Sequence, residues 1–374
     1  MSSTPAPPPG KSPLHAVQVL GRGSSGNGAH VRSLTAGLVA RGVRVTVCAP
    51  RAAERAYDFT GAGAQFGPVA ARTDPATVAV LRAVCGQADV VHAHGLRAAV
   101  RAALALGGRR TPLVVTWYTR GSAEGTRAQV VRLMERRAVR AAAVVLGTSS
   151  GLVDRARRRG ARDARLTAVS APRSLVPDAG GADAELRRSK ARAELGAVDR
   201  PVLLAVGRLE PRQGHSLLLD AARGWRDLDP QPLLVLAGEG PERPLLQRRI
   251  DAESLPVRLL GRHDDVPELL AAADVAVLPS RWEARAVLAQ EALRAGVPLV
   301  ATAVGGIPEL VGDAAELVPY GDAEALSATV ARLLADPGRR ARLSAAGRAQ
   351  AATWPTEDET VAQVLSVYDE LAGR

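Results

Sequence analysis

Two glutamates flank the start of a predicted helix in the C-terminal half of the chain. Glu283 follows the apolar run DVAVLP, and Glu291 lies eight residues further along. The two carboxylates can accept hydrogen bonds from hydroxyl groups, while the first amides of the helix, near Ala286 and Val287, favour an anion. This arrangement suits a sugar diol, a diphosphate and a ribose diol. A solvated pair of glutamates is the alternative interpretation.

A second candidate group follows the apolar run PVLLAVG (201–207). Arg208 comes directly after this predicted strand, and Gln213 lies five residues later. A guanidinium at the carboxyl end of a strand can bind two oxygens of a diphosphate. A single arginine after a strand is more often a surface residue, so this interpretation depends on the combination with the two glutamates.

A glycine-rich segment follows the first predicted strand, HAVQVL. Gly21, Gly23, Gly26 and Gly28 allow the backbone to approach an anion, and residues 21–26 match the G-x-G-x-x-G pattern of dinucleotide-binding loops. The helix pattern starts only after Gly28, and no acidic residue follows the second strand to bind a ribose diol. An arginine there keeps an NADP-dependent oxidoreductase as an alternative, and a turn that binds no ligand is another.

These groups would be positioned by strands that alternate with helices in two blocks. Short apolar runs bounded by turn residues predict strands, and they lie at 15–20, 43–50, 88–94, 111–117 and 142–150, then at 201–207, 232–238, 257–261, 274–279 and 298–303. The alternation predicts an α/β fold of two Rossmann-like, doubly wound domains with mainly parallel sheets. Such sheets bind ligands at the carboxyl ends of their strands, so we expect the two domains to face each other across a cleft.

Composition divides the chain into five expected segments. The first is rich in Pro and Ser, and a Pro- and Gly-containing break separates the two blocks. The segments are a disordered N-terminus (1–13), an N-terminal domain (14–178), an interdomain linker (179–199), a C-terminal domain (200–354) and a C-terminal helix (355–374).

Composition also narrows the class of protein. Hydrophobic residues make up 47% and charged residues 23%, as in a folded, soluble chain. No uncharged apolar run approaches the roughly 18 residues that cross a bilayer, and the first residues lack the apolar region of a signal peptide. Two cysteines, Cys48 and Cys85, are too few for a disulfide scaffold or a cysteine-based zinc cluster. We therefore expect a cytoplasmic location.

Six segments together resemble one family. They are Gly207-Arg208, Glu283-x7-Glu291, AGVPLVAT (295–302), GGIPE (305–309), SGNGAHV (25–31) and DVVHAHG (89–95). Their pattern is similar to that of the family 4 retaining glycosyltransferases, and the resemblance extends over residues 15–372. It implies a GT-B fold, in which the N-terminal domain is the acceptor side, the C-terminal domain binds the nucleotide sugar, and the final helix crosses back to the first domain.

The resemblance also implies roles for individual residues. Glu283 resembles the family's donor-sugar glutamate, Glu291 its ribose glutamate and Arg208 its diphosphate arginine. The implied donor-binding residues are Gly26, Gly28, Arg208, Gln213, Arg262, His263, Glu283, Ala286, Val287 and Glu291; the implied catalytic residues are Glu283, Arg208 and His94; the acceptor-side candidates are His30, Tyr118 and Arg120. The family implies transfer from a nucleotide-diphosphate sugar with retention of configuration, without a cofactor or a bound metal.

The donor side departs from the family pattern at two places. Gln213 stands where the family usually has a lysine, and losing that charge beside a leaving diphosphate would cost on the order of 1–3 kcal/mol. We expect Arg212 or Arg285 to supply the charge instead. Residues 284–286 are Ala-Arg-Ala where a Gly-Phe-Gly is usual, so the backbone approach is tighter. These departures keep open a weakly active or inactive nucleotide-sugar-binding partner protein as the alternative function.

The acceptor side departs at Tyr118, which stands where many members have a histidine near the transferred sugar. His94 and His30 remain as polar candidates. For each of them, a buried histidine with a purely structural role is the alternative to a catalytic one.

The net charge of +11 is concentrated in one segment. Fifteen arginines and four acidic residues lie between Arg101 and Arg165, so this segment alone accounts for the excess. Arg132, Arg136 and Arg140 recur at helical spacing, and residues 155–159 form a second cluster. Aromatic residues are only 3%, and no nucleic-acid-binding module is present, which disfavours nucleic acid. An anionic membrane surface or a lipid-linked or anionic acceptor is the functional interpretation, and a solvated face is the alternative.

Overall fold

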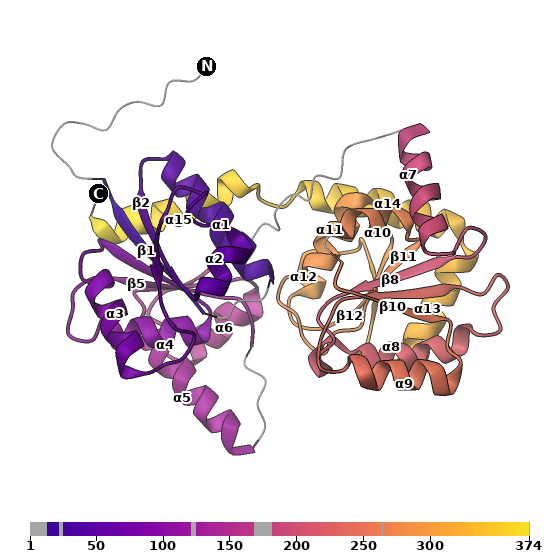
Figure 1. Ribbon diagram of the computed structural model, residues 1–374, viewed down its shortest axis with the longest axis horizontal. Helices are drawn as coiled ribbons and strands as arrows, with labels where there is room; N and C mark the ends of the chain where they lie inside the picture. The colour runs from indigo at the N-terminus through magenta and orange to yellow at the C-terminus, as the bar shows by residue number, and fades with distance from the viewer. Residues whose placement is uncertain (1–12, 22–24, 121–124, 168–181, 264, 374) are drawn as a thin grey trace. The chain divides into compact units, whose positions relative to one another are not determined.

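The chain forms two compact α/β units in a computed structural model that describes residues 13–21, 25–120, 125–167, 182–263 and 265–373 (Figure 1). Unit 1 comprises residues 1–172 and 355–374, and unit 2 comprises residues 173–354. Each unit contains one parallel sheet covered by helices. The α/β architecture of two Rossmann-like units confirms the predicted fold class. The N-terminal segment predicted to be disordered lies outside the described residues, except for Pro13.

Unit 1 contains a seven-stranded sheet in the order β3-β2-β1-β4-β5-β6-β7. Its strands are β1 (His15–Leu20), β2 (Arg44–Ala49), β3 (Gln65–Pro68), β4 (Val90–His94), β5 (Leu113–Trp117), β6 (Val144–Gly147) and β7 (Ala164–Leu166). Its helices are α1 (Ser25–Ala40), α2 (Arg51–Tyr57), α3 (Pro75–Cys85), α4 (Leu96–Ala105), α5 (Gly125–Ala141), α6 (Ser150–Arg158) and α15 (Glu357–Ala372). The order reverses between β1 and β4, so the connections after these two strands pass to opposite faces of the sheet, which is where open α/β sheets bind ligands.

Unit 2 contains a six-stranded sheet in the order β10-β9-β8-β11-β12-β13. Its strands are β8 (Val202–Val206), β9 (Leu233–Ala237), β10 (Val257–Gly261), β11 (Val275–Leu278), β12 (Leu299–Thr302) and β13 (Glu316–Val318). Its helices are α7 (Ala182–Glu194), the 3-10 turns η1 (Pro211–Gln213) and η2 (Arg223–Trp225), α8 (His215–Ala222), α9 (Arg243–Glu253), α10 (Val266–Ala272), α11 (Val287–Ala295), α12 (Ile307–Val311), α13 (Ala323–Ala335) and α14 (Pro337–Ala352). Here the order reverses between β8 and β11.

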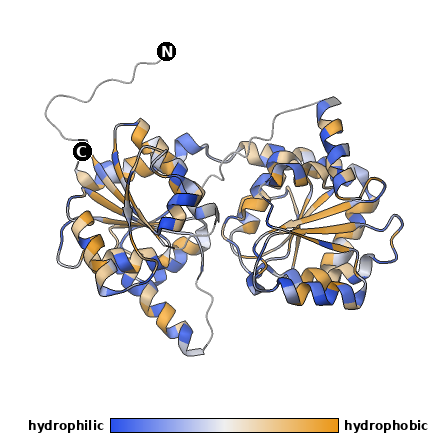
Figure 2. Cartoon of the chain, in the orientation of Figure 1, coloured by the Kyte–Doolittle hydropathy of each residue, from blue (hydrophilic) through white to orange (hydrophobic). Residues whose placement is uncertain are grey.

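Apolar strands buried on both faces hold each unit together. Successive strand residues point to opposite faces of the sheet, so alternate residues join two separate cores. In unit 1 one core lies under α1 and α15 and the other under α3 to α6; in unit 2 one lies under α10 to α12 and the other under α8, α9 and α13. In Figure 2 the strands at the centre of each unit are coloured mainly as hydrophobic, whereas the surrounding helices carry both hydrophobic and hydrophilic residues.

The predicted linker at 179–199 is wrong for its described part. Residues 182–194 form helix α7, which packs against α10 and belongs to unit 2. Arg188 and Arg192 on this helix bind the carboxylate of Asp274 at 2.6 and 2.9 Å. Asp274 precedes β11, so the two ion pairs fasten the helix to the sheet. Residues 179–181 lie outside the described residues.

Helix α15 packs on unit 1 although it follows unit 2 in the sequence. It begins with a capping box, in which the Glu359 amide donates to the Thr356 hydroxyl and the Thr356 amide donates to the Glu359 carboxylate. Val361 of α15 lies against Gly37 of α1, where a Cβ would overlap its side chain. Because Gly37 has no side chain, the two helices approach closely.

A buried chain of hydrogen bonds joins α15 to the sheet of unit 1. The Gln18 side-chain amide donates to the Tyr368 hydroxyl at 2.8 Å, and this hydroxyl donates to Nδ1 of His92 at 2.7 Å. Nε2 of His92 then donates to the Thr116 hydroxyl at 2.7 Å. On the other side of Gln18, its carbonyl oxygen accepts from His94 Nε2 at 2.6 Å. Each polar side chain of this network therefore has a hydrogen-bond partner inside the core.

Replacing Tyr368 with phenylalanine tests this hydrogen-bond network. Tyr368→Phe keeps the ring but leaves the Gln18 amide and His92 Nδ1 buried without their partner, at about 1–3 kcal/mol for each group. We expect the midpoint of thermal unfolding to fall by several degrees, measured by circular dichroism. Tyr320→Phe is the matched control, since Tyr320 is 44% exposed and its replacement should leave the midpoint unchanged. Equal midpoints for the two variants would contradict a stabilising role for the hydrogen-bond network.

Candidate active site

The candidate site in unit 2 lies where the strand order reverses. Residues 207–213 follow β8 and residues 279–286 follow β11, so both loops start at the carboxyl ends of neighbouring parallel strands. Ligands of open α/β sheets bind at this position. The sequence had placed Arg208 and Glu283 after these two strands, and the sheet order now makes the strands adjacent.

Glycines let the loops at this edge pack backbone against backbone. Gly238 has a φ of 148°, and a Cβ there would overlap the carbonyl oxygen of Gly207. Gly305 has a φ of 59°, and a Cβ there would overlap the carbonyl oxygen of Glu283. The next amide, of Gly306, donates to that same oxygen at 2.9 Å. The Gly305-Gly306 pair therefore holds the backbone of Glu283, and a larger residue does not fit at Gly305.

The side chain of Glu283 is only 15% exposed, and three contacts meet at its oxygen Oε1. The Gln213 amide donates at 3.1 Å, the Ser280 hydroxyl lies at 3.3 Å, and Nη1 of Arg212 lies at 3.4 Å. Burial raises the pKa of Glu283, and the charge of Arg212 followed by the two hydrogen bonds opposes this rise. The carboxylate is held in one orientation by three different loop residues.

Ser280 is a site residue that the sequence analysis missed. It is fully buried, its hydroxyl lies 3.1 Å from the Gln213 carbonyl oxygen, and its own carbonyl accepts from the Thr302 hydroxyl at 2.6 Å. Its position directly after a predicted strand was the available signal. Ser280 thus links the end of β11 to both Gln213 and Glu283.

Arg208 is 64% exposed and lies beside Glu210, an acidic residue of its own loop. Its Nε donates to Glu210 at 2.6 Å, and the other carboxylate oxygen of Glu210 lies 3.5 Å from Nε of Arg212. Glu210 therefore sits between two arginines. A guanidinium that is this exposed can turn towards a diphosphate by exchanging one carboxylate for another anion.

The remaining donor-side candidates lie at the same edge of the sheet. Glu291 is half-buried on the second turn of α11, while buried Ala286 precedes this helix and exposed Val287 begins it. Arg262 and His263 are exposed directly after β10. Of the two arginines expected to supply a cation, Arg212 lies next to Glu283, whereas the Arg285 guanidinium lies 5.6 Å from the centre of the Trp354 ring. Contact of either arginine with a diphosphate stays a prediction.

The acceptor-side histidines of unit 1 are buried. His94 has both ring nitrogens engaged, with Nδ1 accepting from the Tyr118 hydroxyl at 2.7 Å and Nε2 donating to Gln18. His30 packs edge-on against both rings, at 6.2 and 6.0 Å. Burial lowers the pKa of His30 to about 4 and that of His94 well below its usual value, so both are neutral at ordinary pH. Arg120 is exposed beyond β5. This geometry favours a structural role for His94, and its catalytic role stays a prediction.

The glycine-rich segment differs from the prediction at one point. Helix α1 begins at Ser25 and not after Gly28, so Gly26 lies in its first turn. Gly28 faces the ring of Tyr57, which leaves no room for a side chain. Residues 22–24 lie outside the described residues. The end of β2 still lacks a carboxylate, because Pro50 and Arg51 follow it.

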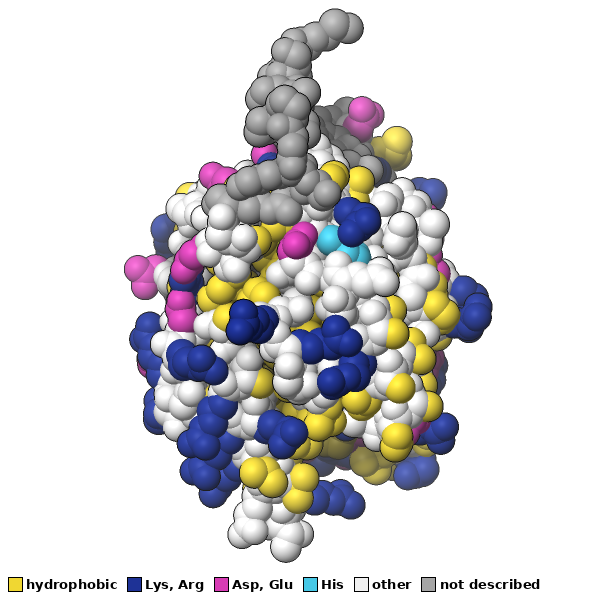
Figure 3. All heavy atoms as spheres, turned by 90° about the vertical axis from the view of Figure 1, so that its left-hand side faces the viewer, with side chains coloured by type: hydrophobic (Ala, Val, Ile, Leu, Met, Phe, Trp, Pro, Cys, Tyr) yellow, Lys and Arg dark blue, Asp and Glu magenta, His cyan; other side chains and the backbone are white. Residues whose placement is uncertain are grey.

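The surface of α5 carries part of the predicted basic face. Arg132, Arg136 and Arg140 are exposed, and Figure 3 shows Lys and Arg side chains gathered on unit 1. The predicted second cluster is partly wrong: Arg155 and Arg159 bind buried Glu135 of α5 at 2.9 and 2.8 Å. These two arginines neutralise a buried carboxylate and do not add to an open basic surface.

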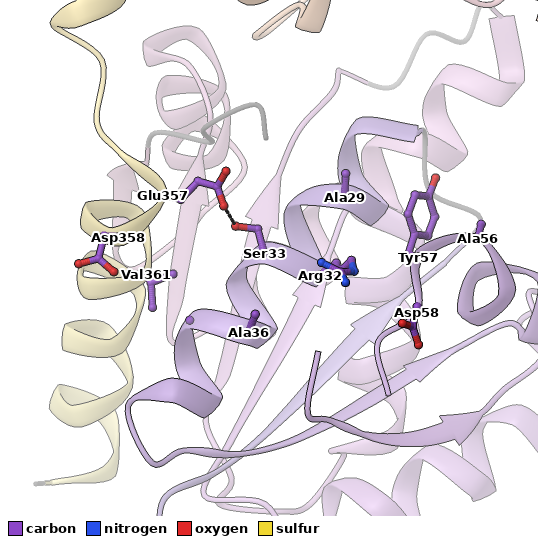
Figure 4. Close-up of a pocket in the computed structure, with 11 residues that line it drawn as sticks. Ala29, Arg32, Ser33, Ala36, Ala56, Tyr57, Asp58, Glu357, Asp358 and Val361 are labelled. Carbon is purple, nitrogen blue, oxygen red and sulfur yellow. Dashed lines mark hydrogen bonds between the residues drawn. The ribbon is translucent and has the colours of Figure 1, made fainter. Parts of the chain in front are cut away.

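A cavity of about 590 Å³ lies in unit 1 between α1, α2 and α15 (Figure 4). Its wall includes Ser33, whose hydroxyl donates to Glu357, and Asp58 at the end of α2. Small residues of α1, Ala29 and Ala36, also line the cavity. The cavity contains none of the candidate site residues.

Comparisons with known proteins decide the family. Residues 25–172 match the model for the glycosyl transferase 4-like domain, and residues 187–350 match that for glycosyl transferases group 1. The chain is 30% identical over 274 residues to alpha-maltose-1-phosphate synthase of Mycolicibacterium smegmatis, covering 65% of this chain and 67% of that protein. The chain belongs to the family 4 glycosyltransferases.

Other curated relatives match over a smaller part, and the chain spans about half their length. Alpha-D-kanosaminyltransferase of Streptomyces kanamyceticus is 35% identical over 228 residues, which are 58% of this chain and 57% of that protein. The GDP-mannose-dependent monoacylated alpha-(1-6)-phosphatidylinositol monomannoside mannosyltransferase of Corynebacterium glutamicum is 37% identical over 182 residues, 46% of this chain and 48% of that protein.

Solved structures confirm the GT-B fold expected for a family 4 glycosyltransferase. Anabaena Alr3699/HepE in complex with UDP-glucose has a TM-score of 0.79 at 22% identity and covers 94% of this chain and 99% of that chain. WaaG, a glycosyltransferase involved in lipopolysaccharide biosynthesis, has a TM-score of 0.70 at 19% identity, with 96% and 100% covered.

Membrane-spanning helices and metal-binding clusters are both absent from the described residues of this glycosyltransferase. None of the helices in the described ranges is long and apolar enough to span a bilayer. Within the same ranges, no three His, Cys, Asp or Glu side chains are grouped so that they could bind a metal ion.

The raised pKa of Glu283 predicts a stability effect. The folded chain keeps a proton on this carboxyl to a higher pH than the unfolded chain does, so the ionised carboxylate lowers the free energy of unfolding at neutral pH. We expect Glu283→Gln to raise the thermal midpoint at pH 7.5, by roughly 2–4 °C for each kcal/mol regained. The gain should shrink as the pH falls through the range in which the wild-type carboxyl takes up its proton.

Glu324→Gln is the control for this prediction, because Glu324 is an exposed glutamate of unit 2. Its midpoint should follow that of the wild type at every pH. A lower midpoint for Glu283→Gln at pH 7.5 would show that the three contacts to Oε1 outweigh the burial of the charge.

Proposed function

We propose that this protein is a retaining, metal-independent glycosyltransferase that moves a sugar from a nucleotide-diphosphate sugar to an acceptor. The observation that carries the proposal is the oriented carboxylate of Glu283, flanked by Arg212 and close in sequence to the start of α11, at the switch point of the unit 2 sheet. Family membership supports the same reaction class.

The donor side follows from the chemistry of these groups. Glu283 accepts hydrogen bonds from hydroxyls of the transferred sugar, and Glu291 accepts those of the ribose diol. When the bond between the sugar and the diphosphate breaks, the electron pair remains on the diphosphate. Arg208, Arg212 and the first amides of α11 then stabilise its growing negative charge without a metal ion.

The acceptor is proposed to be anionic or lipid-linked and to be recognised by unit 1. His30, Tyr118 and Arg120 are the acceptor-side candidates, at or near the carboxyl ends of its strands. Relatives include D-inositol 3-phosphate glycosyltransferase of Salinispora arenicola and the phosphatidylinositol monomannoside mannosyltransferase described above. Their names support an acceptor that carries a phosphate.

A nucleotide-sugar-binding partner protein with little activity is the second candidate. The observation that favours it is the neutral Gln213, which donates to Glu283 in a position where the family usually has a lysine. Measurable transfer over many turnovers with any donor would dismiss this candidate.

A donor screen tests the proposed function. We expect UDP-, GDP- or ADP-sugars to raise the thermal midpoint of the purified protein, since a ligand at 100 times its Kd adds about 2.7 kcal/mol. Glu291→Ala should weaken nucleotide binding about 10- to 100-fold by removing a charged hydrogen-bond acceptor, and Glu283→Ala should abolish transfer and donor hydrolysis. Glu324→Ala, an exposed glutamate of the same unit, is the control. Unchanged turnover in Glu283→Ala would refute its role.

The protein is also proposed to work at the inner face of a membrane through α5. Beside the three exposed arginines, Val130 and Leu133 of this helix are 59% and 68% exposed. Figure 1 shows α5 extending outward at the edge of unit 1. Cationic and apolar side chains on one protruding helix suit the interface of an anionic bilayer.

Vesicle binding separates the contribution of the arginines from that of the apolar side chains. On vesicles rich in anionic lipid, we expect replacement of Arg132, Arg136 and Arg140 by glutamate to abolish cosedimentation at low salt, because each arginine contributes about 1 kcal/mol near the surface. Replacement of Val130 and Leu133 by serine should weaken binding that persists at high salt. The charge-matched control changes exposed Arg226, Arg248 and Arg342 of unit 2 to glutamate. Equal losses in both triple variants would attribute binding to net charge alone.

A further inference from the structure

Arg285 occupies the loop that presents Glu283, but its side chain leaves the site. Glu283 contacts Gln213, Ser280 and Arg212, whereas the Arg285 guanidinium lies 5.6 Å from the centre of the Trp354 ring. Ala284 and Ala286 on either side of it are buried. The loop is therefore fixed at two points, by the contacts of Glu283 and by the contact between Arg285 and the indole.

The Arg285 guanidinium is buried with few polar contacts. Its Nε and Nη2 have no hydrogen-bond partner among the described residues. Burial, followed by the charge of Arg294, lowers the pKa of Arg285 to about 10, while Glu309 opposes the shift. Arg294 of α11 also lies 5.6 Å from the Trp354 ring. The π-face of one indole is thus the main partner of Arg285, and it is shared with a second arginine.

Trp354 is placed where the chain leaves unit 2. It is the last residue of that unit, it packs against the core under α10 to α12, and Thr356, the cap of α15, lies two residues later. The segment that connects the two units therefore begins at the residue on which Arg285 rests.

We propose that Arg285 is a positioning residue, which fixes the Glu283 loop by resting on Trp354 and so couples the connecting segment to the donor-sugar glutamate. The proposal rests on the proposed function for its kinetic readout. Arg285 touches no substrate in this role. Where the family pattern usually has a phenylalanine within this loop, Arg285 instead contacts Trp354 at the end of the unit.

The kinetic test compares variants of both partners. We expect Arg285→Ala and Trp354→Ala each to lower kcat/KM for sugar transfer about tenfold, while the Kd for the nucleoside diphosphate alone changes less than about twofold. The double variant should lose no more than either single variant, because one contact is lost in all three. Trp354→Phe, which keeps an aromatic face, should recover most of the activity.

Arg294→Ala is the matched control. It removes the other guanidinium from the same indole but lies on α11, outside the Glu283 loop. It should therefore lower stability to a similar degree while leaving kcat/KM closer to the wild type. Additive losses in the double variant, or an equal loss of kcat/KM in Arg294→Ala, would overturn the proposal.

Limited trypsin digestion gives a readout that needs no enzymatic activity. In the wild type, the bond after Arg285 should be protected, because the guanidinium is buried against Trp354. We expect cleavage there to rise about tenfold in Trp354→Ala and to stay low in Trp354→Phe, relative to cleavage after exposed Arg226 in the same digest. Unchanged protection in Trp354→Ala would refute the anchoring contact even if no donor is found. If cleavage is faster in Trp354→Ala but the protein binds no donor, the anchoring contact stands and only the proposed function is refuted.

Discussion

The buried carboxylate of Glu283 is the constraint on which the rest of unit 2 depends. A carboxylate with so little exposure is tolerated only where polar groups satisfy it, and here Gln213, Ser280 and Arg212 do so from two loops. The backbone of the same residue needs Gly305, because any side chain there would displace its carbonyl oxygen, and the Gly306 amide donates to that oxygen. The loops after β8, β11 and β12 are therefore fitted to one residue, and their parallel strands bring them to one edge.

The central strands could be predicted because they are buried on both faces and their sequences are almost wholly apolar. The edge strands β3, β7 and β13 could not, since they have three or four residues and are only partly buried. Helix α7 was mistaken for a linker for a related reason. Its sequence, ADAELRRSKARAE, has little apolar surface, and its place depends on two arginines that bind Asp274 about 80 residues away. Sequence periodicity does not reveal a long-range ion pair.

The site residues could be placed along the chain, but their contacts could not. Arg208 and Glu283 each follow a predicted strand, and this position predicted that both belong to the site, because the carboxyl ends of parallel strands meet at one edge. The direction in which a loop side chain turns depends on its neighbours in space, and the sequence alone does not identify them. Arg212 and Arg285 were equivalent candidates for the missing cation, yet only Arg212 reaches Glu283. In the same way, two arginines of the predicted basic face turned inward to Glu135.

The contacts of Arg212 and Gln213 change how the glutamine at position 213, in place of the usual lysine, is interpreted. A neutral side chain in place of the usual lysine removes a charge from the site only if no other cation replaces it, and Arg212 lies 3.4 Å from Glu283 in the preceding position. A lysine beside Arg212 would add a second cation where the neutral amide of Gln213 now donates a hydrogen bond. A positive charge is therefore present next to Glu283 although residue 213 is neutral. For this reason the geometry favours an active transferase over a binding protein that has lost its chemistry.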